Sequence, residues 1–216
     1  MSTRLAVFLA AITALGCGAA FAATLNVGSS HLWAGSQTLT KGTCTLSGTT
    51  ATTDTYVDEH AATSSFGSAT TLNVSPKMNN RTWSFVRFDL SSCNIPSTGG
   101  ADSATLSVRI TGAPSSSRTI DVAPVGATWS GTTSWNGAQT LSYGSTTTSF
   151  ATGTTSNVTK SITVTVDVDA LIKSGTANYG WRLSDSGGNA NTATVFASSE
   201  AATATDRPQL VINYEK

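Results

Sequence analysis

The feature that most constrains the fold of this chain is a strict alternation of apolar and polar residues in several short runs. The alternation is clearest over residues 104–110, 162–168 and 210–214, where every second side chain is apolar. Successive side chains of a strand point to opposite faces, so these runs predict strands with one buried face and one solvated face. Turn-rich segments separate the runs, at residues 97–100, 114–117, 131–134 and 186–189. The sequence therefore predicts an all-β protein, an antiparallel β-sandwich of jelly-roll type that forms a single domain.

One short segment departs from this pattern. Residues Asp169–Lys173 predict about one turn of helix. Gly175 is expected to end it, because glycine readily adopts the left-handed conformation that follows many helices.

The N-terminus has the features of a targeting segment. Arg4 precedes an apolar run over residues 5–15, and residues 20–22 fit a small-x-small cleavage site. This pattern predicts a signal peptide over residues 1–22, and the run is too short to span a bilayer. A lipoprotein signal ending at Cys17 is the alternative, although Leu15 stands one place too close to that cysteine. We therefore expect a secreted, extracellular protein that does not span a membrane.

The cysteines predict one disulfide. Cys17 would leave with the signal peptide, so that Cys44 and Cys93 remain. An even pair of cysteines in an exported chain indicates a disulfide. The alternative, two free thiols, is not expected outside the cell. The bond would close a loop of about 50 residues and contribute on the order of 4 kcal/mol.

Charge and motifs limit the function classes. The chain has 12 basic and 12 acidic residues and no basic stripe, which argues against nucleic acid as a partner. The sequence contains no nucleophile elbow, zinc-protease helix, phosphate-binding loop or dinucleotide fingerprint. A two-carboxylate glycosidase or lyase stays open, because such pairs follow no sequence spacing. We expect that the protein is not an enzyme.

Three separated segments resemble one known family. They are Thr53–Leu90, Trp129–Asn136 and Phe196–Tyr214. Together they resemble the DNRLRE-type domain, also called carbohydrate-binding module family 96, over nearly all of the mature chain. The resemblance divides the chain into the signal peptide, an N-terminal extension over 23–52 and the family's β-sandwich over 53–216.

The resemblance implies a non-catalytic module that binds polysaccharide outside the cell or at its surface. A structural or adhesive surface protein that uses the same sandwich as a scaffold is the alternative. The family's pair of tryptophans corresponds to Trp129 and Trp135, which we expect to close an open end of the sandwich. Trp181 is expected in the core.

A candidate binding face lies on the strand that ends at Leu90. Trp83, Phe85 and Arg87 share one face of this strand, while Val86 and Phe88 occupy the other. If the second face is in the core, the first presents two aromatic rings and a guanidinium, which suit the faces and oxygens of a sugar. The alternative is that a loop or the N-terminal extension covers Trp83 and Phe85.

Two further assignments concern charged residues. Arg87 and Glu200 match the positions of an arginine and a glutamate in the family pattern, which implies a structural ion pair. Asp54, Asp58 and Glu59 cluster in sequence, as do the oxygen-bearing residues of the loop 185–191. Either group could bind a structural calcium ion, but their spacing fits no standard calcium loop. No other cofactor is expected.

Overall fold

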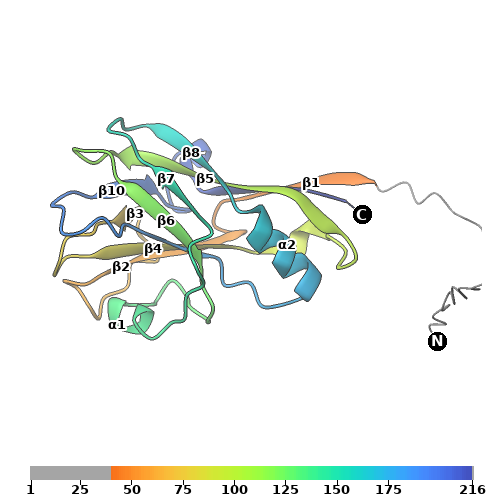
Figure 1. The fold of residues 1–216 in the computed structure, drawn as a ribbon, viewed down its shortest axis with the longest axis horizontal. Helices are drawn as coiled ribbons and strands as arrows, with labels where there is room; N and C mark the ends of the chain where they lie inside the picture. Colours follow the sequence, from red (N-terminus) through yellow and green to blue (C-terminus); the bar gives the residue numbers. More distant parts are fainter. Residues whose placement is uncertain (1–39, 216) are drawn as a thin grey trace, which may run out of the picture. The chain divides into compact units, whose positions relative to one another are not determined.

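Two antiparallel β-sheets stack face to face in the computed structural model, which describes residues 40–215 (Figure 1). Sheet A contains β1 (Lys41–Ser47), β11 (Gln209–Glu215), β5 (Gly100–Gly112), β10 (Thr194–Ala197), β3 (Thr71–Val74) and β8 (Val158–Thr163). Sheet B contains β2 (Thr52–Asp58), β4 (Thr82–Phe88), β9 (Trp181–Ser184), β6 (Thr119–Pro124) and β7 (Thr148–Ala151). Two short helices and two 3₁₀ turns complete this part of the chain, α1 (Trp135–Ala138), α2 (Thr165–Ser174), η1 (Leu90–Cys93) and η2 (Ala204–Asp206). The predicted all-β sandwich is confirmed.

The core lies between the two sheets and follows the predicted alternation. Leu106 and Ile110 of β5 are fully buried and belong to one cluster with Val86 and Phe88 of β4. Trp181 lies in the same cluster, as expected for a core residue. Burying apolar faces of two sheets against each other is the main favourable contribution to such a fold.

The run 162–168 was predicted as one strand, and this prediction is wrong beyond Thr163. The ladder between β8 and β5 ends at the pair Thr163 and Thr105. The amide of Ala104 donates to Oγ1 of Thr165 at 2.9 Å, and the chain turns into α2. Gly175 ends this helix with φ +62, as predicted.

A second apolar cluster covers the outer face of sheet B. It is built from the covering segment, residues 125–143, which includes α1 and lies against β2 and β4 (Figure 1). Trp129 and Trp135 are buried in this cluster beside Phe85. They therefore cover a sheet face, whereas we expected them to close an end of the sandwich.

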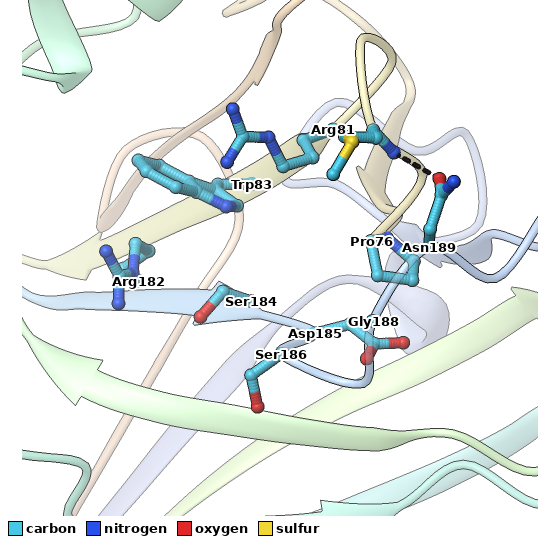
Figure 2. A pocket seen from close by; sticks show the side chains of 10 residues that line it. Pro76, Arg81, Trp83, Arg182, Ser184, Asp185, Ser186, Gly188 and Asn189 are labelled. Atoms are coloured by element: carbon cyan, nitrogen blue, oxygen red, sulfur yellow. Dashed lines mark hydrogen bonds between the residues drawn. The ribbon is translucent and has the colours of Figure 1, made fainter.

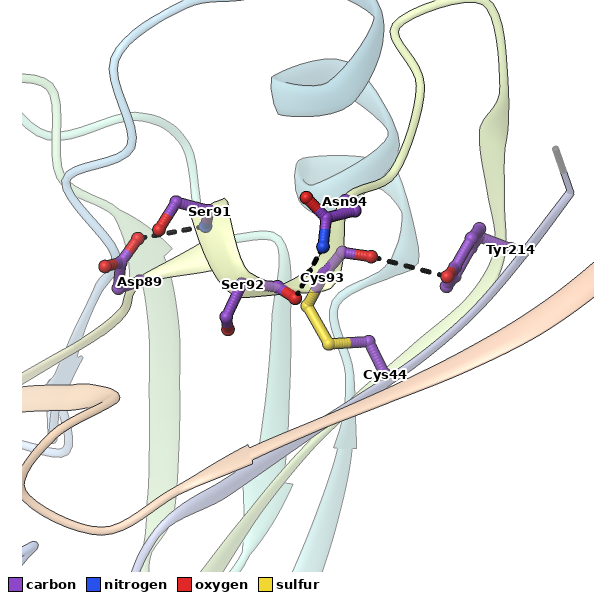
Figure 3. The surroundings of a disulfide bond; sticks show 7 residues. All are labelled: Cys44, Asp89, Ser91, Ser92, Cys93, Asn94 and Tyr214. Atoms are coloured by element: carbon purple, nitrogen blue, oxygen red, sulfur yellow. Dashed lines mark hydrogen bonds between the residues drawn. A yellow bond between two sulfur atoms is a disulfide. The ribbon is translucent and has the colours of Figure 1, made fainter.

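The predicted disulfide joins Cys44 of β1 to Cys93 of η1, with the Cα atoms 5.5 Å apart (Figure 3). The hydroxyl of Tyr214 donates to the carbonyl of Cys93 at 3.3 Å beside it. β1 pairs with β11 over its whole length, from Lys41 with Glu215 to Ser47 with Gln209. The described part of the predicted extension is thus an edge strand of sheet A.

Three predictions concern residues outside the described part of the chain. They are the signal peptide, the lipoprotein alternative at Cys17 and the first part of the extension. Within residues 40–215, no helix is long and apolar enough to cross a membrane.

Candidate functional site

Strand β4 places its three candidate residues in three different environments. Phe85 is fully buried, with its ring centre 5.4 Å from that of Trp129 and 6.3 Å from that of Tyr143. The prediction of an exposed Phe85 is therefore wrong, because the covering segment packs on this residue. Trp83 and Arg87 are only partly buried, and they lie at opposite ends of the strand.

Trp83 forms one wall of an open cleft of about 390 Å³, here called the Trp83 cleft (Figure 2). The cleft lies on the outer side of sheet B, between the β3–β4 hairpin and the loop that follows β9. Its lining residues are Pro76, Met78, Arg81, Trp83, Arg182, Ser184, Asp185, Ser186, Gly188 and Asn189. Aromatic, cationic and hydroxyl groups thus converge on one hollow.

Arg182 of β9 lines this cleft and lies against two aromatic rings, that of Trp83 in the cleft and that of Tyr143 in the covering segment. Its guanidinium carbon lies 4.8 Å from the centre of the Trp83 ring and 4.0 Å from that of Tyr143. Burial lowers the pKa of Arg182, with partial compensation from Tyr143 and Asp121. Among residues 40–215, Arg182 forms no ion pair, and its buried Nε has no hydrogen-bond partner. This guanidinium therefore retains capacity to bind an anionic or polar group.

Arg81 contributes a second guanidinium, which is already paired. Its Nη2 lies 2.6 Å from Oε1 of Glu59, and its Nε donates to Oε2 of the same residue at 2.9 Å. The hydrogen bonds from Arg81 lower the pKa of Glu59. The Arg81 guanidinium also stands over the Trp135 ring at 5.4 Å, so that its position is fixed from two sides.

The loop on the far side of the cleft is held by internal bonds. The guanidinium of Arg118 donates to both carboxylate oxygens of Asp185, at 2.7 and 2.9 Å. Ser186 donates to Asp121 at 2.8 Å, and Oδ1 of Asn189 accepts from the amide of Met78 at 2.7 Å. These bonds hold the lining residues of the loop in place, which lowers the ordering cost of binding.

The predicted pair of Arg87 and Glu200 is not formed in the described part of the chain. Arg87 stands over Trp129, with its guanidinium carbon 5.3 Å from the ring centre, and lines a separate polar cleft of about 510 Å³ with Asp89 and Asn178. Glu200 instead accepts a hydrogen bond from Ser199 at 2.9 Å and lies beside Asp54. The two residues lie on different faces of sheet B, because Asp54 and Arg87 have opposite parity on their paired strands.

The carboxylates considered for calcium have other partners. Glu59 holds Arg81, Asp185 holds Arg118, and Asp58 accepts the amide of His60 at 2.8 Å. Within residues 40–215, no three His, Cys, Asp or Glu side chains converge as a metal site. Calcium binding stays a prediction.

Arg81 and Arg182 line the cleft, but neither is among the site residues predicted from the sequence. Arg182 alternates with Trp181, so once Trp181 is in the core, Arg182 must point to the outer face. Trp83 points to the same outer face, so the sequence indicates that both side chains lie on one side of the sheet. Trp83 and Arg182 come together because β9 pairs with β4. The alternation pattern does not predict which strands are neighbours in the sheet.

Comparison with known proteins agrees with the site chemistry. Aromatic faces and guanidinium groups in a shaped hollow are suited to hold a sugar ring through its C–H faces and oxygens. No curated protein matches the chain significantly. The family model for carbohydrate-binding module family 96 matches residues 45–214. Since this match covers well over half of the sequence, the chain belongs to carbohydrate-binding module family 96.

Proposed function

We propose that this protein is a secreted, non-catalytic module that binds polysaccharide through the Trp83 cleft. Family membership supports carbohydrate as the ligand class. The observation that carries the proposal is the stack of Trp83, Arg182 and Tyr143 at an open cleft. Signal peptide 1–22 would export the chain, and a disulfide suits an oxidising, extracellular environment.

The chemistry of the cleft favours a sugar that carries a carboxylate. Arg81 and Asp185 are neutralised by Glu59 and Arg118. Arg182 is stacked on aromatic rings and forms no ion pair within residues 40–215. A planar guanidinium held in this way can grip a carboxylate through two parallel hydrogen bonds.

A binding comparison of two matched arginines tests the proposal. Arg182 stands over Trp83 and Arg87 stands over Trp129 at similar distances, 4.8 and 5.3 Å, in different clefts. The protein, Arg182→Met and Arg87→Met would be compared by affinity electrophoresis and calorimetry on acidic and neutral polysaccharides. Methionine keeps an apolar stem of similar length in each variant and removes the charge.

We expect that Arg182→Met lowers the affinity for an acidic polysaccharide at least tenfold, equivalent to about 1.4 kcal/mol. Arg87→Met should bind as the unmodified protein does. Equal losses in both variants, or unchanged binding by Arg182→Met, would place the ligand outside the Trp83 cleft. Circular dichroism of each variant separates a loss of binding from a loss of fold.

A structural or adhesive scaffold is the second candidate, and the outer face of sheet A favours it. This face presents threonine and serine on β1, β5 and β8, and Thr45, Thr105 and Thr163 share one row in which β11 places Val211. Among the described strands, β1 pairs only with β11, so its other edge is available for strand addition. Absence of affinity for every polysaccharide, together with self-association in ultracentrifugation, would support the scaffold.

A further inference from the structure

A carboxylate pair, Asp54 and Glu200, lies away from the Trp83 cleft, where a partly buried turn meets the inner face of sheet B. Asp54 of β2 pairs in register with Val86, a core residue, so its side chain points into the sandwich. Only 3% of Asp54 is exposed. Glu200 comes from the turn 198–201 that follows β10, and Ser199 of this turn donates to both carboxylates, which places the two side chains beside each other.

The donors around the pair are too few for two carboxylates. Oδ2 of Asp54 accepts the amide of Ser199 at 2.7 Å, and Oε1 of Glu200 accepts the hydroxyl of Ser199 at 2.9 Å. Oε2 of Glu200 is buried and has no hydrogen-bond partner among the described residues. A buried carboxylate oxygen without a donor is costly, and two such charges in contact repel each other.

Within residues 40–215, no basic side chain forms an ion pair with Asp54 or Glu200. Arg87, the one arginine within β4, points to the opposite face and stands over Trp129. Arg207, which follows the turn, donates through Nε to the carbonyl of Ala201 at 2.8 Å. Strands β3 and β10, which flank the turn, contain no charged residue. Glu200 is thus the charged group that faces Asp54.

We propose that Asp54 and Glu200 share one proton, and that this proton fastens the turn 198–201 to strand β2. In the protonated pair, one carboxyl donates to the other, and the amide of Ser199 completes the link to sheet B. The same turn is tied to the neighbouring loop, because Ser198 donates through its hydroxyl to Ala69 at 2.6 Å. Loss of the proton to solvent leaves two anions in contact and loosens this link between the sheets.

The pH at which the link is lost follows from the surroundings of Asp54. Burial raises its pKa from 3.8 to about 7, and the charge of Glu200 acts in the same direction, against the amide of Ser199. The folded protein therefore holds this proton more tightly than the unfolded chain does. The stabilisation is complete below the unfolded pKa and disappears as the pH rises through the folded pKa.

Thermal unfolding of the protein at pH values from about 5 to about 9 tests the proposal, with three variants. Asp54→Asn and Glu200→Gln each replace one carboxyl by an amide that can donate without titrating. Asp102→Asn is the matched control, because Asp102 is an exposed carboxylate paired with Lys41 at 3.1 Å. We expect the midpoint of the unmodified protein and of the control to fall by roughly 5–15 °C over this range. In Asp54→Asn the fall should be less than half as large, and in Glu200→Gln it should be smaller than in the unmodified protein, because burial alone still raises the pKa of Asp54 there.

A midpoint that does not change between these pH values, or a Glu200→Gln variant with the slope of the unmodified protein, would overturn the proposal. Hydrogen exchange at the amide of Ser199 gives a second readout in the unmodified protein. Its protection factor should drop at least tenfold above pH 7, while the core strand β5 stays protected. Constant protection at Ser199 contradicts the proton link even where Asp54→Asn does not fold.

Discussion

Asp185 is a buried carboxylate whose charge is held by a single arginine side chain. Its side chain is 1% exposed, and that of Arg118 is 15% exposed. The guanidinium of Arg118 also donates to the carbonyl of Gly187 at 2.8 Å. Arg118 therefore neutralises Asp185 and also holds the conformation of the loop that borders the Trp83 cleft.

We predict that Arg118→Met lowers the free energy of unfolding by about 3–5 kcal/mol, because it leaves an uncompensated buried charge. Urea titration followed by tryptophan fluorescence measures this change. The double variant Arg118→Met/Asp185→Asn should regain a large part of the loss. Lys41→Met is the control, since the lysine side chain is 74% exposed and solvent screens its ion pairs. If the two single variants cost the same, the Arg118 pair does not stabilise the fold.

The strand parity of individual residues could be predicted from the sequence, but their exposure could not. Val86 and Phe88 lie in the core as the alternation indicated. Trp83 and Phe85 do share the opposite face, yet only Phe85 is fully buried. The covering segment packs on both, with Trp135 against Trp83 and Trp129 against Phe85, but it buries only Phe85 completely. Its aromatic residues stand more than forty positions away in the chain. A local pattern contains no information on which distant segment covers a face.

At the scale of elements, the same limit explains the helix α2. Val164 and Val168 are buried, a spacing of four that fits a helix, but Val164 and Val166 also continue the alternation of β8. Val166 distinguishes the two patterns, because it is 75% exposed. The hydroxyl of Thr165 accepts a hydrogen bond from the amide of Ala104. The strand ladder therefore ends at this point and the helix begins. Tertiary contact therefore decided between two periods that the sequence allowed equally.

Two glycines with similar positive φ angles give an element-scale prediction. Gly180, which precedes β9, has φ +67, and Gly153 has φ +71. A Cβ on Gly180 would lie 2.7 Å from Cα of Arg87, whereas nothing is within 4 Å of a Cβ on Gly153. Alanine at either site carries the cost of a left-handed residue, about 1–2 kcal/mol. At position 180 it also forces β9 away from β4.

We therefore expect Gly180→Ala to lower the free energy of unfolding by about 1–3 kcal/mol more than Gly153→Ala does. Chemical unfolding of the two variants measures the difference directly. Equal destabilisation would mean that β9 moves away from β4 at no cost in free energy. Only the left-handed backbone conformation would then determine the loss of stability.

At the scale of the whole molecule, the described chain begins and ends in the same sheet. β1 pairs with β11, the last strand, and the disulfide ties β1 to η1, directly after β4 of sheet B. The bond thus joins an edge strand of one sheet to the chain that leaves the other (Figure 3). The cysteine pair could be predicted from the sequence. The strand partner of β1 could not, because a local pattern does not show which distant strand pairs with residues 41–47.

Removal of the disulfide should destabilise the whole sandwich while leaving its strand pairing intact. The bond closes a loop with a sequence separation of 49, so Cys44→Ala/Cys93→Ala should lose about 4 kcal/mol of unfolding free energy through the entropy of the unfolded chain. Hydrogen exchange distinguishes this effect from local fraying. An unfolded-state effect lowers the protection of β5 and β1 together, because the most protected amides exchange through global unfolding. Loss of protection confined to β1, with an unchanged midpoint in urea, would show that the disulfide stabilises only the edge strand and not the whole sandwich.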